Sequence, residues 1–429
     1  MKMKKTLLLS IIFFTLLGYS QNFVNQVLIL NEGYYDYNAD SIINPVTVGS
    51  YNIQTNTYST VNTLTDMRFA SDLIIDGNYY YVAADTKIFK FDLETHQEIA
   101  QVNCTGVRNI AVYNDKLIAT RGEYQTLFSS YLHLYNSNNL QLELTFDTIN
   151  GPKWASQNLV VEGNSAYIAV NNAYELGNEK GIVGILNLDN LTYGNEIDLG
   201  ANGKNPDNMV LNNGFIYTVN NKDWSGSSVS KISVANGALS STVDIASTST
   251  GCGTSSLRDN KLVYQMSQDN VLNEFDINLM NNIGPLNNFS LNYYELCQNP
   301  ISGNLYASNT DFFSYGNVYI YDANNIEIIN FSAGVSPGTI KFDVRSNTGI
   351  QEIGNSIFLY PNPSSDKLYF DENLEGTINV YNILGETLIS KEIKDNQNFI
   401  NISDLKNGKY ILQYRNSLDK VITKSFVKI

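Results

Sequence analysis

One strand pattern recurs six times along the chain, and it constrains the fold more than any other feature of the sequence. Each copy has an apolar strand, a turn such as Asn-Gly or Asp-Asn, a second strand rich in Tyr and Ile, a loop of variable length, and a strand that ends near Asp. The first strands begin near residues 72, 109, 158, 208, 256 and 295. Periods of about 40 to 50 residues with about four strands per repeat are typical of propeller blades. The sequence therefore predicts an all-β protein that contains a β-propeller.

The segments before and after the six repeats supply the strands of one more blade. Three strands are expected near residues 27–31, 48–53 and 58–63, and the stretch SPGTIKFDV contains another at residues 338–344. Pairing of residues 338–344 with 27–31 completes a four-stranded blade and hides the free sheet edges. We therefore expect residues 21–344 to form a seven-bladed β-propeller that is closed by its own two ends.

The loops of variable length fall between the second and third strands of the repeats. In a propeller these loops share one face with the crossings from blade to blade, around the mouth of the central channel. Such a face is where propellers usually bind ligands. Five of the loops are long and rich in aromatic residues: NEGYYDYNADSIINP from Asn31, RGEYQTLFSS from Arg121, NNAYELGNEKG from Asn171, NNKDWSGSS from Asn220 and NTDFFSYGN from Asn309.

Aromatic side chains on this face can stack on a flat or sugar-like ligand, while arginine and aspartate side chains hold its polar edge. The alternative is that part of the aromatic set only packs between the loops. The predicted ligand-binding residues are Tyr34, Tyr35, Tyr37, Arg68, Arg108, Tyr124, Trp154, Tyr174, Asp207, Trp224, Phe312 and Phe313.

The charge balance and the first residues indicate an exported protein that does not bind nucleic acid. The formal net charge is -15 and no cluster of Lys and Arg interrupts it, so a polyanion would be repelled. Lys2, Lys4 and Lys5 precede a short apolar run at residues 7–17, which predicts a secretory signal peptide at residues 1–20. No segment reaches the roughly 20 apolar residues of a transmembrane helix, so we expect no membrane span.

The sequence does not predict an enzyme, a metal site or a cofactor. His96 is expected in a turn on the opposite face and His133 inside a strand, so neither is placed for acid-base catalysis. A polysaccharide-active enzyme is a weaker alternative, which would need two carboxylates that converge in the channel mouth. The three cysteines do not make a disulfide framework. A bridge between Cys252 and Cys297 and three buried thiols are both open.

From residue 355 the strand pattern changes, after a polar linker that is expected at residues 345–354. The tail contains YPNP at Tyr360–Pro363, VYNILG at Val380–Gly385 and NGKY at Asn407–Tyr410. On these motifs, residues 355–429 resemble the C-terminal sorting domain of the Bacteroidetes type IX secretion system. The resemblance implies a small β-sandwich, contact with the type IX machinery, and export through the periplasm to the medium or the outer cell surface. An ordinary β-sandwich accessory domain is the alternative.

The repeats resemble bacterial propellers of the YncE-like, surface-layer type. The resemblance lies in the strand pattern, in ILNEG at Ile29–Gly33 and in Gly-x-Arg-Asn at Gly106–Asn109. This group includes the surface propellers of gut Bacteroidetes that capture cobalamin. The resemblance implies a non-enzymatic propeller that binds an extracellular small molecule, such as a corrinoid or a glycan fragment. A protein-interaction or adhesion platform on the same face is the alternative, and it predicts a flatter apolar surface without a closed pocket.

Overall fold

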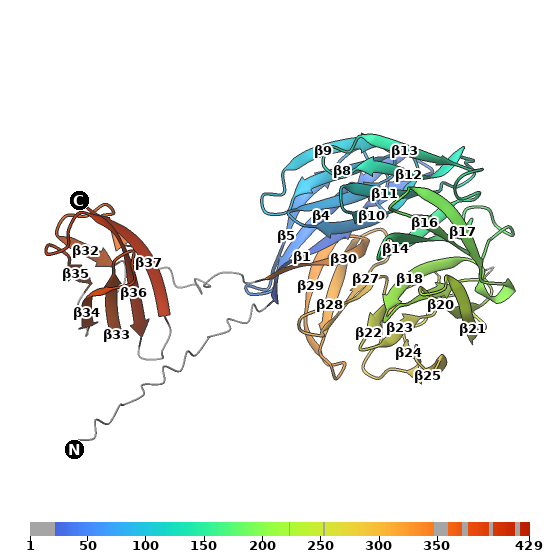
Figure 1. Cartoon of the computed structure of the whole chain (residues 1–429). Coiled ribbons are helices and arrows are strands. Elements are labelled where there is room, and N and C mark those ends of the chain that lie inside the picture. The colour runs from blue at the N-terminus through green and yellow to red at the C-terminus, as the bar shows by residue number, and fades with distance from the viewer. Residues whose placement is uncertain are drawn as a thin grey trace, which may run out of the picture. The chain divides into compact units, whose positions relative to one another are not determined.

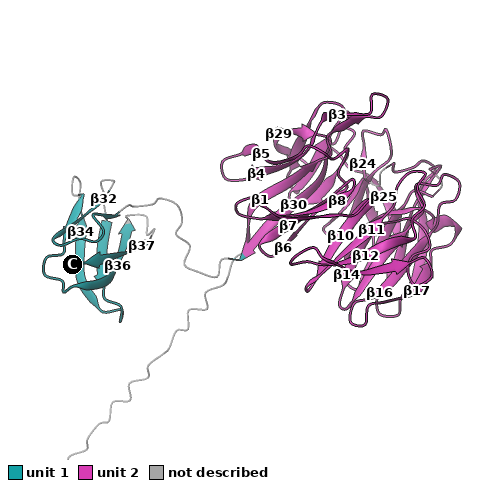
Figure 2. Ribbon diagram, turned by 90° about the horizontal axis from the view of Figure 1, so that it is seen from above, with its two compact units in different colours: residues 1–21, 346–429 teal, residues 22–345 magenta. Residues whose placement is uncertain are grey.

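The computed structural model describes residues 22–222, 224–251, 254–346, 359–370, 376–393, 398–416 and 421–429. They belong to two compact units, of which the larger is Asn22–Arg345 and the smaller includes Ser346–Ile429 (Figure 1 and Figure 2). Strands and loops make up these residues, apart from the short 3-10 helix η1 (Ala201–Gly203). No helix in the described part of the chain is long and apolar enough to cross a membrane. The predicted signal peptide, residues 347–354 of the predicted linker and Cys252 lie outside the described residues.

Seven four-stranded sheets follow one another around the larger unit (Figure 1). The first strands of neighbouring sheets contact each other, so they are the inner strands of the ring. Blades 2 to 7 each use four consecutive strands, which follow one another from the inner strand outward. Blade 2 is β6–β9 (Asp72–Asp76, Tyr79–Ala84, Lys87–Asp92, Glu98–Asn103) and blade 3 is β10–β13 (Val107–Tyr113, Lys116–Arg121, Ser130–Asn136, Leu142–Asp147). Blade 4 is β14–β17 (Ser156–Glu162, Ser165–Val170, Ile182–Asn187, Thr192–Asp198) and blade 5 is β18–β21 (Pro206–Asn212, Phe215–Asn220, Ser227–Ser233, Ala238–Ala246). Blade 6 is β22–β25 (Ser255–Arg258, Lys261–Gln265, Leu272–Asp276, Asn281–Pro285) and blade 7 is β26–β29 (Leu296–Gln298, Leu305–Asn309, Tyr315–Tyr321, Glu327–Val335).

Blade 1 is built from both ends of the unit. Its inner strand is β30 (Pro337–Ser346), which lies beside β1 (Asn22–Asn31), followed by β4 (Val46–Asn52) and β5 (Thr57–Leu64). The strand order β30-β1-β4-β5 is the one expected for a blade shared between the two ends. The predicted seven-bladed β-propeller is therefore confirmed.

The closing strand runs further than its sequence pattern indicates. Arg345, which the pattern places in the linker, is part of β30. Its guanidinium group contacts the carboxylates of Asp343 and Glu94, each at 2.8 Å. Because Asp343 is buried, this pairing keeps the last residues of β30 against blade 2.

The core of the propeller lies between neighbouring blades. Seven clusters of buried apolar side chains each draw on two adjacent sheets, and one of them joins blade 7 to blade 1 through Ile29, Tyr306 and Ile340. Successive side chains of a strand point to opposite faces, so Tyr80 packs toward blade 1 and Tyr81 toward blade 3. Strands that are buried on both faces are apolar along their whole length, and this accounts for the apolar runs in each repeat.

The tight turns between first and second strands have the backbone conformation that their residues favour. In blade 5, Asn213 and Gly214 have φ of 49° and 75°, and in blade 6, Asp259 and Asn260 have φ of 48° and 62°. Two consecutive positive φ angles are typical of the type I′ turn, which Asn, Asp and Gly tolerate best. These turns fix the register of the inner strand pairs and leave the opposite face free to carry long loops.

The five long aromatic loops join the second and third strands of blades 1, 3, 4, 5 and 7. Because strand direction alternates within a sheet, these loops share one face with the crossings between blades, and we call it the loop face. The loop of blade 1 folds into a hairpin of β2 (Tyr34–Asp36) and β3 (Ser41–Asn44). As predicted, His96 lies in a turn between third and fourth strands, on the other face, and His133 lies within β12.

The tail forms two sheets that share one core. One sheet is β31 (Leu359–Tyr360), β32 (Lys367–Phe370) and β35 (Phe399–Asn401). Leu368, Ile378 and Phe426 belong to the apolar cluster between the two sheets, which confirms the predicted β-sandwich. The other sheet, in spatial order, is β34 (Thr387–Ile393), β33 (Gly376–Tyr381), β36 (Gly408–Asn416) and β37 (Val421–Lys428).

Candidate functional site

A central cavity of about 390 Å³ lies where the inner strands meet on the loop face. Its wall repeats one element: in six blades, two consecutive residues at or near the start of the inner strand, directly before a buried apolar residue, line the cavity. The seventh contribution, from blade 6, is Thr254. The six pairs are Ser71-Asp72, Arg108-Asn109, Gln157-Asn158, Asp207-Asn208, Tyr294-Glu295 and Gly338-Thr339.

Blades 7, 1 and 2 make one side of the central cavity acidic. Glu295, Glu32 and Asp72 face it there, together with the ammonium group of Lys341. We call these three carboxyl groups the acidic side. The Tyr294 hydroxyl donates a hydrogen bond of 2.8 Å to Glu32 Oε1. Gly338 makes room for this carboxyl group, because a Cβ atom at that position would collide with Glu32 Oε1.

Burial keeps the carboxyl groups of the central cavity from ionising easily. It raises the pKa of Glu32 to about 7, although the bond from Tyr294 lowers it. It raises the pKa of Glu295 to about 8 against the opposing effect of Lys341, and that of Asp207 to about 6 against the bond from Asn221. These groups therefore titrate in the neutral range, unlike exposed carboxylates.

These raised pKa values predict that the ligand-free propeller loses stability as the pH rises from about 6.5 to about 8, above the pH at which the half-buried His133 and His96 are half-protonated in the unfolded chain. Over that range the folded protein binds more protons than the unfolded chain, whose carboxyl groups are already ionised. The free energy of unfolding should fall by up to about 1.4 kcal/mol per pH unit for each group within its own window. Guanidinium unfolding at several pH values measures this slope.

The variant Glu295→Gln should show a shallower decline with pH than the parent chain, because glutamine stays neutral. Glu98→Gln, on the exposed outer strand of blade 2, is the matched control and should leave the slope unchanged. A free energy of unfolding that rises from pH 6.5 to pH 8 would contradict the assignment of these buried groups.

Blades 3, 4 and 5 make the opposite side of the central cavity rich in amide groups. Asn109, Gln157, Asn158 and Asn208 line it, and we call them the amide side. Gln157 Nε2 donates a hydrogen bond of 2.6 Å to the Tyr174 hydroxyl, which orients both groups. A carboxamide donates and accepts hydrogen bonds at once, as a hydroxyl-rich ligand requires.

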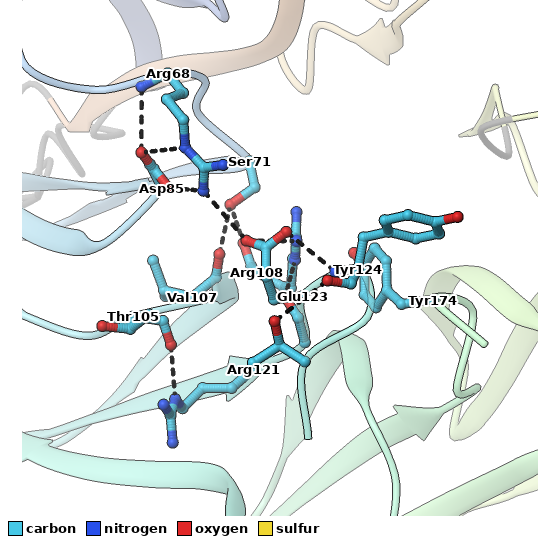
Figure 3. Close-up of polar contacts among 12 residues, drawn as sticks. Arg68, Ser71, Asp85, Thr105, Val107, Arg108, Arg121, Glu123, Tyr124 and Tyr174 are labelled. Atoms are coloured by element: carbon cyan, nitrogen blue, oxygen red, sulfur yellow. Dashed lines mark hydrogen bonds and ion pairs between the residues drawn. The ribbon is translucent and has the colours of Figure 1, made fainter. Parts of the chain in front are cut away.

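Arg108 is held rigidly at the edge of the central cavity. Its Nε atom donates a 2.5 Å hydrogen bond to the Gly122 carbonyl, and Nη2 lies 3.6 Å from Glu123 Oε2 (Figure 3). The guanidinium carbon lies 4.4 Å from the ring centre of Tyr174 and 5.1 Å from that of Phe69. The positive charge of Arg108 is thus paired with a carboxylate, and the rings of Tyr174 and Phe69 pack against the guanidinium group.

Arg68 is engaged in a neighbouring cluster of charges. Its Nη2 atom lies 2.6 Å from Asp85 Oδ1 and 3.4 Å from Glu123 Oε2 (Figure 3). Glu123 thereby joins Arg68 to Arg108. Arg68 supports the loop of blade 3 and does not line the central cavity.

The aromatic residues of blades 1 and 7 pack against one another at the rim. The ring of Tyr34 meets that of Phe313 edge to face at 5.1 Å, and Phe312 meets Tyr294 at 5.0 Å. Through Tyr294, Phe312 supports the acidic side. Phe313 remains 61% exposed, so this pair of loops presents an apolar edge to solvent.

The hairpin of blade 1 carries the remaining tyrosines of the predicted set. Tyr35 and Tyr37 meet edge to face at 4.8 Å, and the Tyr35 hydroxyl donates a hydrogen bond to Asp40. Tyr37 is 69% exposed. The opening motif therefore forms its own small aromatic cluster at the rim, outside the lining of the central cavity.

A second hollow, the side cavity, of about 360 Å³ lies between the loops of blades 3 and 4. Tyr124, Leu127 and Leu176 line it, and Tyr174 lines both this cavity and the central one. Tyr174 is therefore the wall between the two hollows.

The two tryptophans stand apart from the central cavity. Trp154 packs against the core between blades 3 and 4, with the ammonium groups of Lys153 and Lys180 at 5.2 and 5.1 Å from its ring. Trp224 is 42% exposed in the loop of blade 5. Of the predicted set, the structure brings Arg108, Tyr174 and Asp207 together at the central cavity and distributes the others around it.

Sequence reasoning missed most of the residues that line the central cavity, including Asp72, Asn158, Glu295 and Lys341. The signal was present in the repeat, because a polar pair precedes the first apolar residue of nearly every inner strand. Aligning the repeats at that point, instead of at the loops, would have identified this polar ring.

The remaining candidates for chemistry are unreactive or absent in the described part of the chain. No group of three His, Cys, Asp or Glu side chains there is arranged to hold a metal ion. Cys104 and Cys297 are free thiols, and burial raises the pKa of Cys297 to about 12. Burial, reinforced by Arg121, lowers the pKa of His133 to about 4.

Residues 358–428 match the family described as the secretion system C-terminal sorting domain. The match indicates export through the type IX secretion system, to the cell surface or to the outside, with this domain as the contact to the secretion machinery. No curated protein matches the chain.

Two solved structures of the extracellular domain of BT4673 from B. thetaiotaomicron are similar to this chain. One has 14% identity and a TM-score of 0.50, and covers 94% of this chain and 57% of that chain. The other has 13% identity and a TM-score of 0.51, and covers 95% and 58%. The chain thus spans less than two thirds of that protein, and the likeness at this identity shows a shared fold.

Proposed function

We propose that the propeller captures a small polar molecule outside the cell, in the central cavity, without transforming it chemically. The observation that carries the proposal is the ring of residue pairs, polar except for Gly338, which every blade except blade 6 supplies to one cavity. Polar groups that converge in a preformed hollow are the usual mark of a small-molecule site.

The chemistry of the wall favours a glycan fragment over a corrinoid. The four carboxamides of the amide side offer donors and acceptors to ligand hydroxyls, and Tyr174 and Phe69 offer ring faces. At about 390 Å³ the cavity is at the small end of ligand pockets, which suits about one or two sugar rings. A corrinoid is much larger and would have to rest mainly on the rim.

A protein partner on the same face is the second candidate function. It is favoured by the apolar side chains that the loops expose, among them Leu127 at 88%, Tyr37 at 69% and Phe313 at 61%. Exposed apolar residues that share one face often mark an interaction surface.

Titration calorimetry of the purified chain against neutral oligosaccharides, cobalamin, cobinamide and haem tests the proposal. We expect saturable binding of an oligosaccharide, weakened about tenfold or more by Asn158→Leu, because the apolar side chain leaves a ligand hydroxyl without a partner. Asn324→Leu, at an exposed turn outside the cavity, is the matched control and should bind as the parent does.

Corrinoid binding that Asn158→Leu leaves intact would move the site from the cavity to the rim. Absence of binding by every compound, with the protein folded, would favour the protein partner.

A further inference from the structure

We propose that the ligand of the central cavity carries a protonated amine, which lies at the acidic side while its hydroxyl groups lie at the amide side. The ligand class is therefore an amino sugar. This inference rests on the proposed function and adds the charge of the ligand to it.

The wall of the central cavity carries more acidic than basic side chains. Four carboxyl groups line the cavity, from Glu32, Asp72, Asp207 and Glu295, against two cationic side chains. Within the described residues, none of the four carboxyl groups has a cation within 4.0 Å. Carboxylates in a confined space repel one another, so a cation that enters gains more there than in water.

The two cationic side chains of the wall, Arg108 and Lys341, do not neutralise it. The guanidinium group of Arg108 pairs with Glu123 and donates a hydrogen bond to the Gly122 carbonyl. The rings of Phe69 and Tyr174 lie against it. Burial lowers the pKa of Lys341, but Asp72, Cys297 and Glu295 raise it overall. One ammonium group thus serves the acidic side, which leaves Glu32 without a cationic partner.

The surroundings of Glu32 suit an ammonium group. The Tyr294 hydroxyl fixes one carboxyl oxygen at 2.8 Å, so the group is oriented before a ligand arrives. Tyr294 lines the cavity, and its ring is braced by Phe312. A carboxylate held in this way by one oxygen offers the other to an ammonium group, in a charge-assisted hydrogen bond.

The central cavity is divided into two chemically different sides. Glu32 and Glu295 belong to blades 1 and 7, whereas Asn109, Gln157, Asn158 and Asn208 belong to blades 3 to 5, across the axis. A neutral sugar would satisfy only the amide side. A molecule with an amine at one end and hydroxyl groups at the other satisfies both.

Binding of an ammonium group at the acidic side should release protons from it. Burial holds Glu32 partly protonated near neutral pH, so an incoming ammonium group should displace a proton from the acidic side. Both the affinity and the proton release then depend on pH between about 6 and 8. The other titratable and charged groups that line the cavity with Glu32 are Asp72, Arg108, Tyr174, Asp207, Tyr294, Glu295 and Lys341.

The test uses three disaccharides with the same linkage: β-1,4-linked diglucosamine, its diacetylated form and cellobiose. Calorimetry at pH 6.5, in two buffers with different ionisation enthalpies, gives both the affinity and the number of protons released. We expect diglucosamine to bind at least about tenfold more tightly than either neutral compound, with proton release. Glu32→Gln should abolish the preference and the proton release, whereas Glu98→Gln should change neither.

The outcomes separate this inference from the function on which it rests. If the neutral disaccharides bind as tightly as diglucosamine, the capture function holds and the amine is excluded. If none of the three binds while the protein is folded, the inference fails, and the wider panel decides whether the capture function fails with it. If diglucosamine binds equally well to Glu32→Gln, the amine does not lie at the acidic side.

Discussion

Replacement of Asn31 by alanine should lower the free energy of unfolding of the propeller by about 2 to 4 kcal/mol. Asn31 is completely buried at the end of β1. Its Oδ1 atom accepts a 2.9 Å hydrogen bond from the Gly334 amide of blade 7, and its Nδ2 atom donates one of 2.9 Å to the Tyr58 hydroxyl of blade 1. The substitution therefore removes one link across the closure and leaves two buried groups without that partner.

The pairing of β30 with β1 closes the ring, and the Asn31 side chain adds a link beside it, where few main-chain bonds join the end of β1 to the crossing from blade 7. Glu32 N–H donates to the Ser336 carbonyl at 2.9 Å, and Gly33 N–H to that of Val335 at 3.1 Å. Gly334 has no room for a side chain, since a Cβ atom would lie 2.5 Å from Asn31 Cγ. The carboxamide thus fills the gap between the last strand of blade 7 and the first blade.

Guanidinium unfolding followed by tryptophan fluorescence measures the effect. Both tryptophans, Trp154 and Trp224, belong to the propeller, so the signal does not report on the tail. Asn324→Ala removes an exposed asparagine from a turn of blade 7 and should change the stability by less than about 0.5 kcal/mol. If Asn31→Ala is equally neutral, the ring does not rely on this link.

The fold could be predicted from the sequence because each of blades 2 to 7 is formed by one continuous stretch of the chain, and the same strand pattern recurs in each stretch. Turns such as Asn213-Gly214 set a hairpin, and the period of the repeat then sets the number of sheets. The closing blade was also predictable. The first and last strands of the propeller each have an unpaired edge, and pairing them with each other removes both edges. The extension of β30 to Arg345 was not predictable, because it depends on contacts with Asp343 and Glu94 that no local pattern records.

The site was harder to predict than the fold, because its residues come from all seven blades and meet only in the folded ring. Glu32 and Tyr294 come from opposite ends of the propeller sequence and are joined by one hydrogen bond. The aromatic loops were conspicuous in the sequence, but whether a ring faces a ligand or a neighbour depends on packing between blades. Trp154, for example, packs against the core beside two lysines.

Removal of the tail, from residue 347 onward, should abolish delivery of the propeller to the cell surface or the medium. Residues 358–428 match a secretion sorting domain, and the truncated chain keeps all the residues of the compact unit Asn22–Arg345. The tail has its own core, so its loss should not unfold the propeller. In a host that carries the type IX system, we expect the truncated chain to accumulate in the periplasm.

A substitution that unfolds only the tail separates the sorting signal from the mere length of the chain. Leu412 is buried in the tail core, and Leu412→Asp should place an unpaired charge there and block export as the deletion does. Lys391→Ala, on an exposed position of β34, is the matched control and should be exported normally. Protease treatment of intact cells, with fractionation of the periplasm, gives the distribution. Normal export of the truncated chain would show that the tail is not the sorting signal, whereas export of Leu412→Asp alone would show that the signal is read from a linear segment and not from the folded sandwich.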